Sequence, residues 1–207
     1  MLPSFYPVLP DLEWLERLVP LGVRLVQLRL KDAPMREVRR QIRGALELCR
    51  ARDCELVVND YWREAIAARA GFVHLGQEDL AGADLGAIRA AGLKLGLSTH
   101  DEAELATALA ARPDYVALGP VYETKLKVMQ WAPQGLERIR RWKAAVPCPL
   151  VAIGGITLER ADAVYAAGAD CIAVVTDIVT APDPEARVRQ WLASTQNPGA
   201  PSAGHRK

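Results

Sequence analysis

The chain has 207 residues, of which 50% are hydrophobic and 25% are charged, a composition typical of a globular protein with one substantial core. Its 26 basic and 25 acidic residues leave a net charge of +1, so no overall electrostatic field attracts nucleic acid or an anionic membrane. No apolar run approaches the roughly 20 residues that span a bilayer, and the N-terminus lacks a signal-peptide pattern. We therefore expect a single-domain cytoplasmic protein with no nucleic-acid or membrane partner.

Short aliphatic runs alternate along the chain with longer segments of helical period. The runs predict eight strands, at residues 5–9, 25–30, 56–59, 72–75, 93–98, 115–118, 150–153 and 171–176. The longer segments predict eight helices, at residues 12–19, 35–52, 61–70, 85–91, 101–111, 135–145, 158–167 and 184–194.

Eight strand and helix units predict an α/β fold, a single-domain (β/α)8 TIM barrel with short loops over residues 1–195. A doubly wound open sheet is the structural alternative, although no G-x-G-x-x-G motif follows the first strand. Residues 196–207 are rich in Pro, Gly, Ser and Ala and are predicted to be a disordered C-terminal tail.

Polar residues and glycines follow most of the predicted strands. This placement matters because the chemistry of a (β/α)8 barrel lies at the C-terminal ends of its strands. The residues are Gln27, Arg29 and Lys31 on the second strand, Asn59 and Asp60 on the third, His74 to Asp79 on the fourth, Ser98 to His100 on the fifth, Gly119 to Lys127 on the sixth, Gly154 and Gly155 on the seventh, and Thr176 and Asp177 on the eighth.

The second predicted strand carries the clearest binding signal. Gln27, Arg29 and Lys31 alternate with Leu28 and Leu30, so the period of two places the three polar side chains on one face. Two cations on one face favour an anion site. A half-exposed edge strand with solvated charges is the alternative reading of this segment alone.

The motifs at the strand ends resemble, in order, those of the thiamine-phosphate synthase family from about Phe5 to Trp191. They read Q-x-R-x-K, V-N-D, H-L-G-Q-E-D, G-P-V-Y and A-I-G-G-I. The resemblance implies a transferase that joins a hydroxymethylpyrimidine diphosphate to a thiazole phosphate and releases pyrophosphate. It also implies Mg2+ as cofactor, and departure of the diphosphate to leave a pyrimidine-stabilised carbocation that the thiazole nitrogen captures.

The same resemblance assigns site residues. Those expected to bind the pyrimidine diphosphate are Gln27, Leu28, Arg29, Leu30, Lys31, Asn59, Ser98 and Lys127. Arg29, Lys31, Ser98 and Lys127 are the expected catalytic residues among them. Those expected to bind the thiazole phosphate are Thr124, Lys125, Leu126, Gly155, Val175 and Thr176.

Asp60 and Asp79 are the expected metal ligands. Mg2+ usually takes one or two protein carboxylates and completes its octahedron with water and phosphate oxygens. The alternative for Asp60 is an N-cap on a helix starting at Tyr61, and the alternative for Asp79 is a turn residue. Gly154 and Gly155 likewise fit either a phosphate loop or a simple tight turn.

Neither histidine is needed as a general base in the implied reaction. His74 fits a structural role as well as a ligand contact, and His100 is expected to help cap the helix that starts at Asp101.

The segment after Tyr122 departs from the commonest family pattern, P-T-x-T-K, because it reads Glu123-Thr124-Lys125-Leu126-Lys127. Leu126 supplies no hydroxyl to the thiazole side. The connection over residues 123–133 is long and apolar for so compact a barrel, which favours either a lid carrying Lys127 or a static flap packed through Met129 and Trp131.

Two rival functions remain open from the sequence: a thiazole tautomerase on the same barrel, and a non-catalytic barrel that binds a phosphorylated ligand. Both could dispense with the metal carboxylates, so the presence of Asp60 and Asp79 disfavours them. A Schiff-base aldolase using Lys31 is more distant, since a lysine beside Arg29 suits an anion. The small-molecule substrates are the expected partners, and a homo-oligomer is possible.

Overall fold

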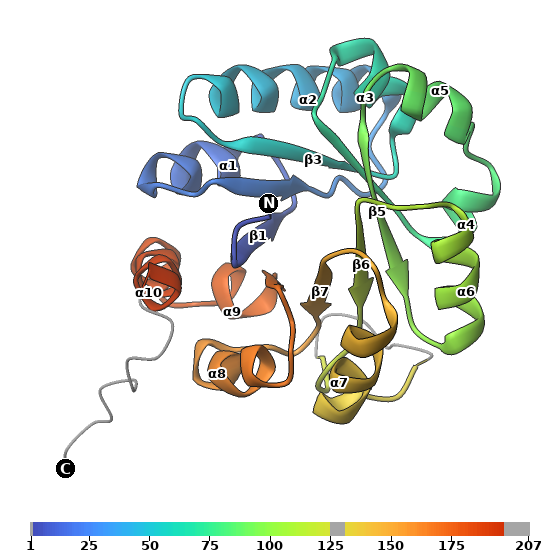
Figure 1. Cartoon of the computed structure of the whole chain (residues 1–207). Coiled ribbons are helices and arrows are strands. Elements are labelled where there is room, and N and C mark those ends of the chain that lie inside the picture. The colour runs from blue at the N-terminus through green and yellow to red at the C-terminus, as the bar shows by residue number, and fades with distance from the viewer. Residues whose placement is uncertain (1, 125–130, 197–207) are drawn as a thin grey trace.

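A closed barrel of eight parallel strands forms the centre of the molecule (Figure 1). The structure is a computed structural model that describes residues 2–124 and 131–196. The strands follow one another around the barrel in chain order, and the last closes it by pairing with the first. They are β1 Phe5–Leu9, β2 Leu25–Leu28, β3 Glu55–Asn59, β4 Phe72–Leu75, β5 Lys94–Thr99, β6 Tyr115–Leu118, β7 Leu150–Ile153 and β8 Cys171–Val174.

Helices connect successive strands and lie outside the barrel (Figure 1), which confirms the predicted (β/α)8 fold. In the part of the chain that the structure describes, no helix is both long and apolar enough to cross a membrane. The helices are α1 Leu12–Leu18, α2 Met35–Arg50, α3 Trp62–Ala68, α4 Gln77–Ala81, α5 Leu85–Ala90, α6 Glu102–Ala110, α7 Gly135–Ala145, α8 Leu158–Ala166, α9 Thr176–Val179 and α10 Pro184–Gln196, with a 3-10 turn, η1, over Val19–Leu21.

The predicted and observed elements differ mainly at the C-terminal ends of strands. β2 ends at Leu28 and β8 at Val174, each two residues earlier than the alternation of side chains predicts. After β2 the N–H of Arg29 still donates to the carbonyl of Leu9 at 2.8 Å, and the chain then turns through Asp32, whose φ is 50°. The short helices α4 and α9 follow β4 and β8 directly. Strand alternation alone does not show where the ladder of hydrogen bonds stops.

Two apolar cores hold the barrel together. The larger lies between the strands and the surrounding helices, and the smaller fills the barrel interior. Gly96 on β5 makes room in the interior for Tyr115 on β6, because a Cβ at Gly96 would lie 2.1 Å from the ring carbon Cζ of Tyr115. A large aromatic ring facing a glycine is the complementary packing that a small barrel needs to fill its centre.

Candidate active site

The strand ends that carry the predicted site residues meet at one rim of the barrel. Because all eight strands are parallel, their C-terminal ends lie at the same end of the barrel. The register pairs Asn59 on β3 with His74 on β4, and Ser98 on β5 with Ala117 on β6. Residues far apart in the sequence are therefore neighbours around the rim.

The five residues of the Q-x-R-x-K motif occupy different depths. Gln27 is only 3% exposed, whereas Arg29 is half-buried just beyond the end of β2 and Lys31 is exposed in the loop before α2. The prediction that all three lie on one strand is therefore wrong, since β2 stops at Leu28. The side chains of Leu28 and Leu30 are buried in the core outside the barrel, so these two residues offer a ligand only their backbone.

The alternative in which Asp60 caps the following helix is wrong. α3 begins at Trp62, and Tyr61 occupies the N-cap position without a side-chain hydrogen bond. Asp60 instead adopts a left-handed φ of 66°, and its N–H donates to the carbonyl of His74 at 2.9 Å. Asp79 lies in the first turn of α4 and is exposed, instead of in a turn between elements. Neither carboxylate is used as a helix N-cap.

Asp79 lies close enough to Asp60 to perturb its ionisation. Burial raises the pKa of Asp60 to about 6, with the charge of Asp79 and a hydrogen bond between the two carboxyl groups acting in the same direction. The charge of Arg29 and a hydrogen bond from Asn59 act against this rise. Two facing carboxylates next to a single arginine form a site whose excess negative charge a divalent cation would relieve.

A chain of hydrogen bonds crosses the barrel interior beneath the rim. The hydroxyl of Tyr115 bonds His74 Nδ1 at 2.9 Å, and His74 Nε2 bonds the hydroxyl of Ser98 at 2.7 Å. Tyr6 and Gln27 also hydrogen-bond the Tyr115 hydroxyl. If Tyr6 and Gln27 donate to the hydroxyl oxygen of Tyr115, Tyr115 donates its own proton to Nδ1 of His74. The other ring nitrogen, Nε2, then carries a proton and donates it to the hydroxyl oxygen of Ser98. The hydroxyl proton of Ser98 stays available to a ligand.

His74 is neutral in this environment. Burial, together with the nearby charge of Arg29, lowers its pKa to about 4. Both ring nitrogens bond other side chains of the barrel, and the ring also stacks on Tyr115 with centroids 5.6 Å apart. The structure thus favours the structural role for His74, in which it fixes the Ser98 hydroxyl at the rim.

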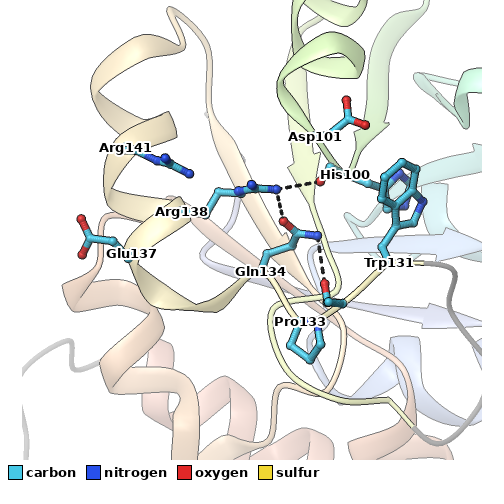
Figure 2. A pocket seen from close by; sticks show the side chains of 9 residues that line it. His100, Asp101, Trp131, Pro133, Gln134, Glu137, Arg138 and Arg141 are labelled. Atoms are coloured by element: carbon cyan, nitrogen blue, oxygen red, sulfur yellow. Dashed lines mark hydrogen bonds between the residues drawn. The ribbon is translucent and has the colours of Figure 1, made fainter.

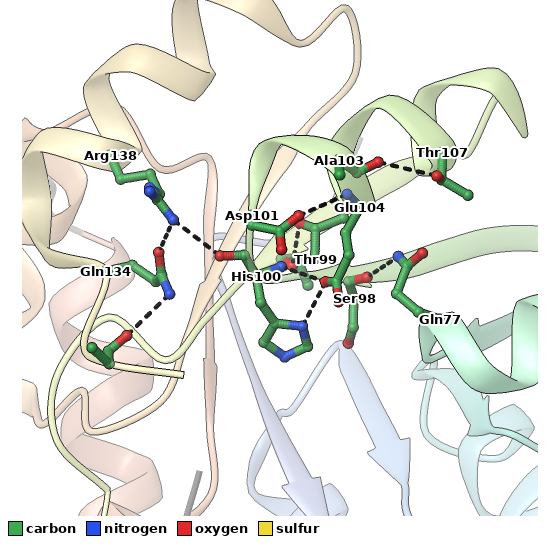
Figure 3. A network of polar contacts seen from close by, with 12 residues as sticks. Gln77, Ser98, Thr99, His100, Asp101, Ala103, Glu104, Thr107, Gln134 and Arg138 are labelled. Carbon is green, nitrogen blue, oxygen red and sulfur yellow. Dashed lines mark hydrogen bonds and ion pairs between the residues drawn. The ribbon is translucent and has the colours of Figure 1, made fainter. Parts of the chain in front are cut away.

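His100 belongs to the cap of α6, as the sequence predicts. Its N–H and its Nδ1 both contact Oε2 of Glu104, at 2.8 and 2.7 Å, while Asp101 is the N-cap and accepts from the N–H of Glu104 (Figure 3). Trp131 stacks on the imidazole ring with centroids 5.4 Å apart, and Arg138 donates to the His100 carbonyl at 3.0 Å (Figure 2).

A cavity of about 490 Å³ opens between the starts of α6 and α7, next to this cluster (Figure 2). Trp131, Gln134 and Arg138 are among its lining residues. Among the predicted site residues that the structure describes, none lines this cavity.

The loop after β7 is in direct backbone contact with the loop after β6. Gly154 and Gly155 have φ values of 96° and 65°, which favour glycine. A Cβ at Gly154 would lie 2.7 Å from the Cα of Pro120, and one at Gly155 would lie 2.4 Å from the carbonyl oxygen of Glu123. Both positions therefore require glycine for two reasons, the positive φ and the close contact with the neighbouring loop. A simple tight turn would require only the first.

Hydrogen bonds from α10 fix the position of the residues that follow β8. Val175 and Thr176 are half-buried at the start of α9. The next residue, Asp177, accepts two hydrogen bonds of 2.8 Å from Arg187 and one of 2.8 Å from the indole N–H of Trp191. This carboxylate therefore fixes the position of α9 relative to α10, and with it the position of Thr176.

Part of the predicted site lies outside the described residues. Thr124 is half-buried and is the last described residue before the gap. Lys125, Leu126, Lys127 and Met129 fall outside, so the lid and its alternative, the static flap, stay predictions. Of the flap residues, Trp131 is described, and it packs on His100.

Sequence reasoning missed the residues that support the site. In the sequence Tyr6 and Tyr115 stand out only as parts of strands, although both face the barrel interior with Gln27 and His74. Every position of β1 and β6 is apolar or aromatic and buried, so alternation alone does not show which face points into the barrel. Arg160 carries no such signal, because its contact with the Tyr122 ring joins two segments that are far apart in the sequence. Arg187 and Trp191 bond Asp177 only because α10 folds back beside α9, which no local pattern shows.

The fold and the rim together define a (β/α)8-barrel enzyme. A family model described as thiamine monophosphate synthase matches residues 7–178. The chain is 64% identical over 195 residues to a thiamine-phosphate synthase of Rhizobium etli, with 94% of this chain and 96% of that relative covered. It is 53% identical over 181 residues to a thiamine-phosphate synthase of Escherichia coli K12, with 87% and 86% covered.

A solved structure described as a thiamine phosphate pyrophosphorylase from Pyrococcus furiosus superposes with a TM-score of 0.84 at 28% identity, covering 95% of this chain and 97% of that one. The chain belongs to the thiamine-phosphate synthase family. The family resemblance read from the strand-end motifs is thereby confirmed.

Proposed function

We propose that this barrel catalyses the reaction that its family membership implies, the joining of a hydroxymethylpyrimidine diphosphate to a thiazole phosphate to give thiamine phosphate and pyrophosphate. The observation that carries the proposal is the close pairing of Asp60 and Asp79 beside Arg29 at the rim. A diphosphate leaving group needs a metal and a cation at the same place, whereas the rival tautomerase and the non-catalytic barrel do not.

The diphosphate half of the rim extends from β2 to β5. In our proposal Arg29 and Lys31 bind the diphosphate oxygens, Asn59 donates from its amide, and Ser98 donates its hydroxyl proton. Gln27 forms the floor of this half through its bond to Tyr115. Leu28 and Leu30 contribute backbone, and Lys127 supplies a further cation from the loop after β6.

The residues present fit Mg2+ as the cofactor. Within residues 2–124 and 131–196, no group of three or more His, Cys, Asp or Glu side chains is placed to hold a metal. A pair of carboxylates is the donor set that suits Mg2+, which takes its other ligands from water and phosphate. Held by Asp60 and Asp79, Mg2+ would neutralise charge on the departing diphosphate.

The thiazole half of the rim extends from β6 to β8. We assign the thiazole phosphate to Gly155, Val175 and Thr176, with Thr124, Lys125 and Leu126 beside it. The positive φ of Gly155 and the close approach of its neighbours support a loop that offers backbone N–H groups to phosphate oxygens.

The chemical work left to the protein is electrostatic. Arg29, Lys31 and Lys127 stabilise the negative charge that develops as the diphosphate departs, and the two halves of the rim hold the thiazole nitrogen near the pyrimidine carbon. A neutral His74 with both nitrogens bonded inside the barrel is unsuited to proton transfer, which agrees with a reaction that needs no general base. Because both substrates are phosphorylated and do not cross membranes unaided, we place the reaction in the cytoplasm.

The direct test is to mix the purified protein with the pyrimidine diphosphate, the thiazole phosphate and Mg2+, and to assay thiamine phosphate and pyrophosphate. We expect equal amounts of the two products, and none after a chelator has removed the metal. Absence of product with both substrates and metal present would overturn the proposal.

A further inference from the structure

Arg160, in the first turn of α8, contacts both loops of the thiazole half of the rim. Its Nη1 donates to the carbonyl oxygen of Gly155 at 2.6 Å, and its guanidinium carbon lies 4.4 Å from the centroid of the Tyr122 ring. Gly155 belongs to the loop after β7, and Tyr122 belongs to the loop after β6. A single side chain therefore joins two segments that are far apart in the sequence.

The backbones beneath Arg160 are already in close contact. The N–H of Val121 donates to the carbonyl of Ile153 at 2.9 Å, and the N–H of Tyr122 donates to the carbonyl of Gly154 at 3.0 Å. These bonds continue the pairing of β6 with β7 beyond the ends of the two strands. Arg160 adds a charged contact at Gly155, the residue that follows the last of these bonds.

The bond from Arg160 also fixes an orientation. In a planar trans peptide the C=O of one residue and the N–H of the next lie in the same plane and point in opposite directions. Holding the carbonyl of Gly155 toward Arg160 therefore directs the N–H of Ile156 to the other side of that peptide. A phosphate loop depends on the direction of such N–H groups.

We propose that Arg160 is a positioning residue for the thiazole phosphate: by bonding Gly155 and stacking on Tyr122, it holds the loop after β7 against the loop after β6. This inference rests on the proposed function, because it gives Arg160 a role in binding one substrate of that reaction. Arg160 acts through Gly155 and Tyr122 and needs no contact of its own with the substrate.

Three variants separate this role from a general structural one. Arg160→Met keeps an aliphatic side chain over Tyr122 and removes the donor, whereas Arg160→Lys retains a charged donor. Arg140→Met is the matched control, because Arg140 is an exposed arginine that pairs with Glu137 on its own helix, at 3.1 Å.

The measurement is the Michaelis constant for each substrate, with the thermal midpoint of unfolding recorded in parallel. We expect Arg160→Met to raise the constant for the thiazole phosphate about fivefold to tenfold, since one charge-assisted hydrogen bond is lost. The constant for the pyrimidine diphosphate and the thermal midpoint should stay at their wild-type values. Arg160→Lys should recover part of the loss, and Arg140→Met should match the wild type.

The possible failures are distinguishable. An unchanged constant for the thiazole phosphate in Arg160→Met would overturn the inference and leave the proposed function standing. Equal rises in both constants, or a lowered thermal midpoint, would also overturn it, because either result shows that Arg160 supports the whole barrel. A wild-type protein that forms no thiamine phosphate would overturn the proposed function and the inference together.

Discussion

Between β2 and β5 the rim presents side chains that the barrel interior holds in place, whereas between β6 and β8 it presents backbone that neighbouring loops hold in place. In the diphosphate half, Ser98 is fixed by His74, which is fixed in turn by Tyr115. In the thiazole half, Gly155 is fixed by contact with Glu123 and by Arg160. Perturbations of interior side chains should therefore affect the first half, and perturbations of loop packing the second.

The largest expected effect is in the diphosphate half, at the carboxylate pair. Asp60→Ala removes a proposed metal ligand, and we expect turnover at saturating substrates to fall about 100-fold or more. Asp53→Ala is the matched control, because Asp53 has a similar left-handed φ, 51° against 66°, and lies before β3 instead of after it. Both variants lose an aspartate from a left-handed position, so Asp53→Ala controls for the change in backbone preference. Equal turnover in the two variants at saturating Mg2+ would refute the metal assignment.

The next effect concerns the interior network and its dependence on pH. The folded-state pKa of His74, about 4, lies below its ordinary value of 6.5. The stability from neutral His74 is therefore present above pH 6.5 and is lost as the pH falls toward 4. Between pH 7 and pH 5 this group should cost the wild type roughly 2 kcal/mol of unfolding free energy.

Urea unfolding of the wild type and of His74→Asn at the two pH values measures this contribution. The variant should lack the part of the pH dependence that His74 supplies, and His100→Asn, which alters a histidine at the cap of α6, should retain it. The same pH dependence in His74→Asn and in the wild type would show that the interior network does not hold a neutral histidine.

A smaller effect is expected in the thiazole half. Gly155→Ala places a Cβ against the carbonyl of Glu123, so the loop after β7 must shift. We expect the Michaelis constant for the thiazole phosphate to rise about tenfold, with that for the pyrimidine diphosphate unchanged. Gly135→Ala has nearly the same φ, 68° against 65°, with nothing within 4 Å of the added Cβ, so it controls for conformational strain. If the two substitutions have similar kinetic effects, the contact with Glu123 does not explain the effect of Gly155→Ala.

The two halves also differ in how far the sequence reveals them. The strand pattern predicts all eight strands. The charged residues Arg29, Asp60 and Asp79 at the strand ends point to the proposed diphosphate half, because their residue types alone suggest binding of a metal and an anion. The thiazole half shows only a glycine pair in the sequence. The two positions require glycine because a Cβ at either one would lie within 3 Å of Pro120 or Glu123. This contact between two loops is not visible in any local sequence pattern.

The interior was missed for a related reason. Tyr115 fills the space above Gly96, and this pairing follows from the register between β5 and β6. Register across a parallel barrel is set by the closure of all eight strands together, so a single strand does not disclose its partner. The hydrogen bonds between neighbouring strands also decide where β2 ends, and this end places Gln27 in the strand and Lys31 in the loop that follows.

The measurement that tests the division of the rim most directly is the pair of Michaelis constants in Arg29→Gln and Thr176→Val. Arg29 lies just beyond β2, and Thr176 begins α9 after β8. Our account predicts that Arg29→Gln raises the constant for the pyrimidine diphosphate at least about tenfold and leaves that for the thiazole phosphate unchanged, while Thr176→Val does the reverse. Equal rises of both constants in either variant would contradict two separate substrate halves.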